Sequence, residues 1–80
     1  MKQNIKENLD GLSTLHGESV YSIHFDGVDN SIKAGNDRTL TISVDDMRSS
    51  KQVWIIEAVN GNEVCRHNTQ YLASVKIHRP

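Results

Sequence analysis

The residues best suited to chemistry are Cys65 and His67, which stand two positions apart in the C-terminal part of the chain. On a β-strand such residues share a face, so the thiol and the imidazole could reach one metal ion. Zinc requires three or four ligands, and His16, His24 and His78 do not supply a second pair at a usual spacing. A cysteine nucleophile would also need a base and an orienting group. The pattern therefore predicts no metal site and no cofactor, with Cys65 as a small core thiol beside a surface imidazole.

The acidic residues in the first half of the chain offer oxygen ligands but fit no known motif. One group comprises Asp26, Asp29, Asn30 and Asp37. Gly27 follows Asp26 directly and no glutamate closes the segment, so it is not a calcium-binding loop, and turn formation explains these residues better. Asp45 and Asp46 are adjacent, so on an extended chain their carboxylates point apart and cannot share a proton. No paired acid and base can be assigned.

The length and the missing motifs argue against an enzyme. The 80 residues provide for a single domain, 1–80, with one thin core. Phosphate-binding, zinc-protease and serine-hydrolase motifs are missing from the sequence. A single cysteine excludes an intrachain disulfide, and no stretch reaches the roughly 18 apolar residues of a membrane helix. We therefore expect a non-enzymatic protein in the cytoplasm that does not contact a membrane.

Residues 1–16 are expected to form a short helix or a flexible arm. Ile5, Leu9, Leu12 and Leu15 recur at intervals of three and four, which places them on one stripe of a helix over residues 3–15. Gly17 would end this helix. The alternative is a frayed terminal segment.

From residue 18 onward the hydrophobic period changes to two, which is typical of β-strands. The expected inward-facing sets are Tyr21, Ile23 and Phe25, then Leu40, Ile42 and Val44, then Ala73, Val75 and Ile77. Residues 53–59 are apolar on both faces apart from Glu57, which predicts a central strand covered on both sides. Asn60-Gly61 predicts a two-residue hairpin turn, and residues 63–67 would form the returning strand.

The remaining segments are interpreted as connections. Residues 26–38 are rich in turn formers and are expected to be mainly loop, with one short strand around Ile32 and Ala34. Residues 45–51 are expected to be a polar hairpin loop, and residues 69–71 a turn or a single 3₁₀ step. The fold class that follows is mainly β (α+β). A short N-terminal helix precedes a five- or six-stranded antiparallel meander over residues 18–79, curled into a small SH3/Sm-like half-barrel.

The C-terminal part of the chain resembles a known family. The helix, the five strands and the stretch that contains Val64, His67, Leu72, Ser74 and Val75 are similar in outline to Sm-like RNA-binding proteins. That family assembles as rings by pairing edge strands, so the resemblance implies a barrel-like topology and oligomeric RNA binding. The chain lacks the family's glycine-rich second strand, and residues 44–47 are only a loose counterpart of its acidic turn.

Two surfaces are candidates for function. The formal net charge of −1 argues against a bulk nucleic-acid binder, and the leading hypothesis is a protein-binding accessory or inhibitory factor, of the kind that phages and mobile elements carry. It would bind through polar loops and an exposed edge strand, and it could form a dimer or higher oligomer. The loop residues are Asp29, Asn30, Lys33, Asn36, Asp37 and Arg48. The alternative is a single-stranded RNA or DNA binder that uses Arg66, Tyr71, Lys76 and Arg79, provided that the strands carrying them are adjacent.

Overall fold

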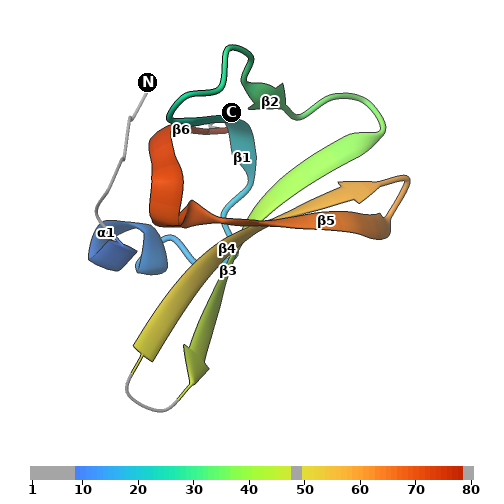
Figure 1. The fold of residues 1–80 in the computed structure, drawn as a ribbon. Coiled ribbons are helices and arrows are strands. Elements are labelled where there is room, and N and C mark those ends of the chain that lie inside the picture. The colour runs from blue at the N-terminus through green and yellow to red at the C-terminus, as the bar shows by residue number, and fades with distance from the viewer. Residues whose placement is uncertain (1–8, 48–49, 79–80) are drawn as a thin grey trace.

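The chain folds into two three-stranded antiparallel sheets preceded by one short helix, in a computed structural model that describes residues 9–47 and 50–78 (Figure 1). The mainly β class is therefore confirmed. The elements are α1 (Leu9–Ser13), β1 (Val20–Phe25), β2 (Ile32–Lys33), β3 (Arg38–Met47), β4 (Ser50–Val59), β5 (Asn62–Asn68), the 3₁₀ turn η1 (Thr69–Tyr71) and β6 (Leu72–Ile77). No helix in the described ranges is long and apolar enough to cross a membrane.

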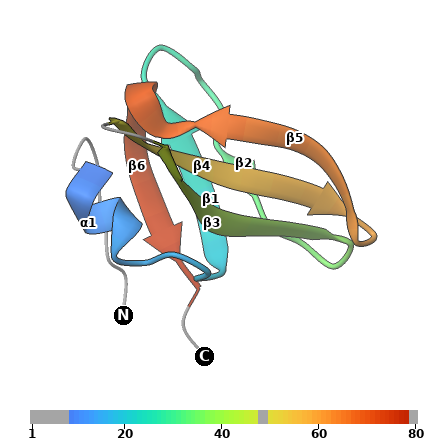
Figure 2. The same ribbon diagram turned by 90° about the horizontal axis from the view of Figure 1, so that it is seen from below.

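The strand order differs from the predicted meander at the last strand. One sheet has the order β2-β1-β6 and the other has the order β3-β4-β5. Figure 2 shows β6 beside β1, whereas β5 runs along β4 in the other sheet. The reason lies in burial, because pairing β6 with β1 places Val20 opposite Ile77 and Ile23 opposite Val75, and all four side chains lie in the core. β5 and β6 consequently do not pair, and among the described strands no closed barrel forms.

The segment just before β1 joins the two sheets. The Gly17 amide donates to the Ile42 carbonyl over 2.8 Å, and the Ile42 amide donates to the Glu18 carbonyl over 3.2 Å. Ser19 forms a bridge with Thr41 of β3, and its carbonyl accepts from the His78 amide over 3.0 Å. These backbone contacts fix how the sheets face each other.

The core lies between the sheets and is covered at one end by α1. Leu12 of α1 is fully buried, as the predicted apolar stripe requires, and Leu15 packs against the core from the turn that follows. The helix ends at Ser13, and residues 3–8 of the predicted helix lie outside the described ranges. The buried hydrophobic side chains of the core are Leu12, Val20, Ile23, Leu40, Ile42, Val53, Ile55, Leu72, Val75 and Ile77.

The β3–β4 hairpin is longer than the sequence suggests. β3 continues to Met47 and β4 begins at Ser50, so the expectation of a loop over residues 45–51 is wrong. Asp45 pairs with Gln52 and Asp46 pairs with Lys51. Asp45, Asp46, Lys51 and Gln52 are all exposed, and backbone pairing between two exposed strands does not require apolar side chains.

β4 is the central strand of its sheet, as predicted, but only one of its faces is fully covered. Val53 and Ile55 are buried against the other sheet, whereas Trp54 and Ile56 on the opposite face remain half-exposed. The sheet therefore presents a partly apolar outer face to solvent.

The predicted inward face of β1 is wrong at Tyr21. The pairing of β1 with β6 shifts register between Val20 and Ser22, which makes Tyr21 the extra residue of a β-bulge. Tyr21 turns outward with 47% of its surface exposed, while Val20 and Ile23 both enter the core. A bulge changes which residues share a face, so strict alternation fails across it.

The β4–β5 turn forms as predicted. Asn60 and Gly61 both adopt positive φ, at 53° and 83°, as a type I′ turn requires. The predicted 3₁₀ step is also confirmed as η1, where the Asn68 side chain caps the turn by accepting from the Gln70 amide. The short strand within residues 26–38 appears as β2.

Candidate functional site

Four polar side chains gather at one end of the inner face of the β3-β4-β5 sheet. They are Arg38, Glu57, Cys65 and His67, called the Glu57 cluster below. Arg38 and Glu57 stand two residues beyond Leu40 and Ile55, so they continue the inward face of their strands after the apolar core ends. The same face therefore changes from apolar to polar along its length.

Glu57 is the centre of this cluster. Its Oε2 accepts from Arg38 Nε over 3.0 Å, and its Oε1 accepts from His67 Nε2 over 2.9 Å. An ionised carboxylate only accepts, so the hydrogen in the second contact lies on Nε2. The Glu57 and His67 side chains are only 13% and 16% exposed, whereas Arg38 is 44% exposed. Two donors thus satisfy the one largely buried carboxylate.

The second ring nitrogen of His67 faces a thiol. Nδ1 lies 4.0 Å from Cys65 Sγ, and the His67 ring also packs against Phe25 of β1 with 5.9 Å between ring centroids. With hydrogen on Nε2, a neutral imidazole leaves a lone pair on Nδ1. Cys65 is exposed and the His67 side chain is only 16% exposed, so the expectation of a core thiol beside a surface imidazole is wrong, and the thiol end of the cluster is open to solvent.

A bulge in β5 brings these residues together. Next to the turn, Ala58 pairs with Glu63, but one step further Glu57 pairs with Cys65, so Val64 is the extra residue. A hairpin with regular pairing would place Glu57 opposite Val64, and Cys65 would then point to the other face. The bulge reverses this outcome and aligns Cys65 and His67 with Glu57.

The cluster places beside Cys65 the two kinds of group that a cysteine nucleophile needs. His67 is a nearby base and Glu57 an orienting carboxylate, and one ligand atom from each of the three residues lies within 4.8 Å of the others. In the sequence, Glu57 stands out only as the single charge in an apolar strand. Its meeting with Cys65 depends on a bulge that no residue type announces.

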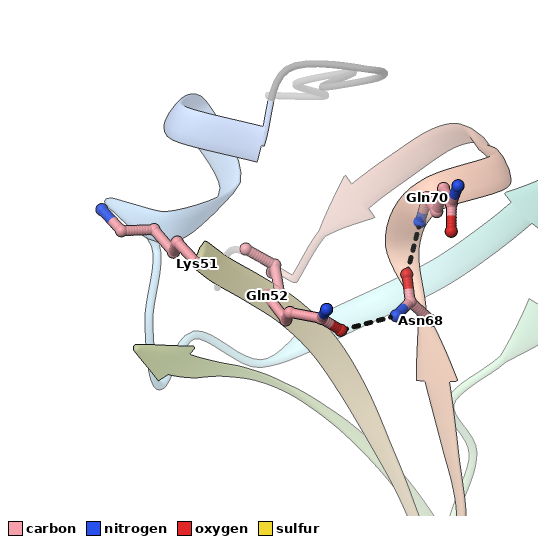
Figure 3. Close-up of a pocket in the computed structure, with 5 residues that line it drawn as sticks. Lys51, Gln52, Asn68 and Gln70 are labelled. Carbon is pink, nitrogen blue, oxygen red and sulfur yellow. Dashed lines mark hydrogen bonds between the residues drawn. The ribbon is translucent and has the colours of Figure 1, made fainter. Parts of the chain in front are cut away.

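Two surface pockets among the described residues lie apart from Glu57, Cys65 and His67, and the second shares Arg38 with the Glu57 cluster. The first, of about 310 Å³, is lined by Lys51, Gln52, Val53, Asn68 and Gln70 (Figure 3). Asn68 Nδ2 donates to Gln52 Oε1 over 3.1 Å, and the Gln70 amide donates to Asn68 Oδ1 over 2.8 Å. The second, of about 230 Å³, is lined by Ser19, Val20, Ala34, Gly35, Arg38, Thr39, Leu40 and His78. Cys65 lines neither of these two pockets.

The predicted loop surface is exposed and continuous with β5. The described loop residues Asp29, Asn30, Lys33, Asn36 and Asp37 all lie at the surface. The Asp37 carbonyl accepts from the Asn60 amide over 2.7 Å, which holds the end of the loop against the turn before β5. Arg48 lies outside the described residues.

The predicted basic residues do not share one sheet. Arg66 lies on β5 and Lys76 on β6, so the expected adjacency of their strands is wrong. Arg66 is also paired with Glu63, at 2.7 Å between Nε and Oε2, which lowers the pKa of Glu63 and raises that of Arg66. Tyr71 on η1 is 67% exposed, and Arg79 lies outside the described residues.

Comparison with known proteins shows no relative, since no family model, no curated protein and no solved structure matches this chain. The geometry described above is therefore what bears on function.

Proposed function

We propose that this protein is a non-enzymatic binding module that takes up an extended segment of another protein along the open edge of β5. The observation that carries the proposal is the position of β5, which ends its sheet and is paired only with β4 among the described strands. Its residues from Asn62 to Arg66 are exposed. An edge strand presents unpaired N–H and C=O groups, and adding a strand there is a common mode of peptide recognition.

Side chains beside the edge can supply specificity. Val64, which is 58% exposed, offers an apolar contact in the middle of the strand. The contact between Asp37 and Asn60 keeps the loop over residues 29–37 next to the start of β5. That loop carries both signs of charge, with Asp29 and Asp37 against Lys33. The loop and the edge would together form a modest interface of about 800 Å² on each side.

The outer face of the sheet extends the same surface. Ile56 pairs with Arg66, and Trp54 pairs with Asn68, so both half-exposed apolar side chains lie one strand in from the edge. Alternate side chains of an added strand would point toward this face. An apolar segment would therefore bury part of Trp54 and Ile56.

The arrangement of strands supports an SH3/Sm-like half-barrel as part of the same proposal. β1 pairs with β6, a 3₁₀ turn connects β5 to β6, and β3, β4 and β5 form the second sheet. In this arrangement β2 and β6 end one sheet, and β3 and β5 end the other. By pairing with β5, a segment of the partner would no longer be available to a third protein. The chain would then act in the cytoplasm as an accessory or inhibitory factor.

The test is selection of linear peptides from a random display library on the full chain. We expect enriched peptides with alternating apolar residues, and slower amide exchange confined to β5 when they bind. The substitution Val64→Asp should weaken binding at least about tenfold, since a charge at a buried contact costs more than about 1.4 kcal/mol. The matched control is Tyr21→Asp, an exposed apolar side chain on the other sheet, which should leave binding unchanged. Failure to enrich any peptide, or equal loss in both variants, would overturn the proposal.

Two further measurements separate the alternatives. Sizing at two protein concentrations shows whether the partner is a second copy, in which case Val64→Asp should shift the protein toward the monomer. Titration with single-stranded RNA and DNA at about 50 and 200 mM salt tests nucleic-acid binding, which weakens steeply over this range. If nucleic-acid binding weakens steeply with salt and is lost in the double variant Lys76→Ala, Arg79→Ala, the partner is a nucleic acid and not a protein.

A further inference from the structure

We propose that Glu57, Cys65 and His67 form a binding site for Zn²⁺. Within residues 9–47 and 50–78 they are the one group of three potential metal-ligating side chains whose ligand atoms lie within 4.8 Å of one another. The proposal is independent of strand addition at the β5 edge, because it concerns the inner face of the sheet.

The distances are close to those that zinc requires. Zinc binds sulfur at about 2.3 Å and nitrogen or oxygen at about 2.0–2.2 Å, so tetrahedral ligand atoms lie roughly 3–4 Å apart. Cys65 Sγ already lies 4.0 Å from His67 Nδ1, and Glu57 Oε1 lies 2.9 Å from His67 Nε2. One ion binds only one nitrogen of the His67 ring, so an ion at Nδ1 beside Cys65 requires the Glu57 carboxylate to turn away from Nε2 toward it, with no change in strand pairing.

The chemistry of the three ligands favours zinc over hard cations. A thiolate, an imidazole and a carboxylate suit a borderline-soft ion, whereas Ca²⁺ and Mg²⁺ prefer oxygen alone. The thiol of Cys65 loses its proton to solvent when its sulfur bonds the ion, while the imidazole ligates as the neutral ring. Three protein ligands leave one coordination position open, and the exposure of Cys65 places it toward water.

The backbone holds the ligands in place before an ion arrives. Glu57 and Cys65 are paired residues of β4 and β5, and His67 is paired with Ile55 of the core. The packing of Phe25 against the His67 ring limits its motion. Preorganised ligands lose less conformational entropy on binding.

Arg38 opposes the ion and therefore provides a second variant. Its Nε lies 3.0 Å from Glu57 Oε2, so the positive charge competes with a metal for the same carboxylate. Oε1 is free of Arg38 and points to His67. Removal of this charge should tighten zinc binding several-fold, because like charges repel at this distance.

The experiment is a Co²⁺ titration of the reduced full chain, followed by displacement with Zn²⁺. We expect a thiolate-to-cobalt charge-transfer band that saturates at one ion per chain and disappears when zinc is added. Cys65→Ser should abolish the band, and His67→Gln should weaken zinc binding by at least about tenfold. Arg38→Gln should strengthen it. The matched control His16→Gln replaces an exposed histidine on the turn that follows α1 and should bind as the wild type does.

Circular dichroism of every variant confirms that a loss of binding does not arise from unfolding. Because Cys65 is exposed, Cys65→Ser is expected to keep the fold. Three results would each overturn the proposal: no charge-transfer band in the wild type, a band that persists in Cys65→Ser, or unchanged zinc affinity in His67→Gln.

Discussion

β1 and β5 each contain a bulge at which one extra residue lies opposite the partner strand, and the two bulges have different consequences. In β1 the extra residue is Tyr21, and the bulge lets both Val20 and Ile23 enter the core. In β5 the extra residue is Val64, and the bulge turns Cys65 and His67 toward Glu57. One bulge therefore improves packing, whereas the other assembles a polar cluster. The same backbone irregularity serves stability in one sheet and chemistry in the other.

The role of the β1 bulge in packing can be tested at Ile23, where the largest effect is expected. Ile23→Ala should lower the free energy of unfolding by about 3 kcal/mol, because it removes a fully buried side chain and leaves a cavity. Chemical denaturation measures the loss. The outward Tyr21→Ala should cost no more than about 1 kcal/mol. Equal losses for the two variants would contradict the assignment of Tyr21 to the bulge.

The β5 region should respond in the opposite manner. Glu57→Gln should lower the free energy of unfolding by no more than about 1 kcal/mol, because the amide oxygen still accepts from His67 Nε2 and the half-exposed Arg38 can turn to water. The same variant should lose about 30-fold in zinc affinity, within the range seen when metal-site residues are removed. Denaturation and competition with a chelator measure the two quantities. A large decrease in the free energy of unfolding together with an unchanged zinc affinity would show that the Glu57 cluster stabilises the fold and does not bind zinc.

Deletion of Val64 should have a smaller effect. With the extra residue removed, Cys65 still pairs with Glu57, because the shift in register occurs at Val64. Cobalt binding should keep its charge-transfer band, with an affinity within about threefold of the wild type, which corresponds to less than about 0.7 kcal/mol. Loss of the band would show that the bulge does more than determine the face of the sheet on which Cys65 lies, and that it also positions the thiol.

The smallest effect is expected at the exposed pair on β5. Arg66 lowers the pKa of Glu63 below its ordinary value of 4.5. The pair therefore stabilises the folded state above that value, and its contribution is lost as the pH falls through the lowered pKa. The stability difference between the wild type and Glu63→Gln should shrink as pH falls below 4.5. A difference that grows in acid would contradict the direction of the shift.

Local patterns predicted the elements that depend on local chemistry. Asn60-Gly61 marked the turn because only a few residue types tolerate two positive φ angles in succession. The alternation of Leu40 and Ile42 marked the inward face of β3, since one face of the sheet is buried. These signals lie in residues that are neighbours in the sequence, so they do not depend on how distant segments pack.

The features that the sequence did not predict depend on contacts between distant segments. Nothing in the types of Tyr21 or Val64 announces a bulge, because the extra residue is chosen by how the whole strand packs. The pairing of β6 with β1 depends on how the sheets cover each other. The candidate site depends on one of these features, since Glu57 and Cys65 meet only through the shifted register of β5.

The pairing of Val20 with Ile77 also determines how the fold responds to force. β1 begins where β6 ends, and the two strands are antiparallel, so tension applied at both ends acts on the same end of the pair. The hydrogen bonds between these strands would then break one after another from that end, whereas force along the strands in opposite directions would load all of them at once. The protein should therefore yield to gentle pulling, which first breaks the contacts of residues 17–19 with β3 and then separates β6 from β1.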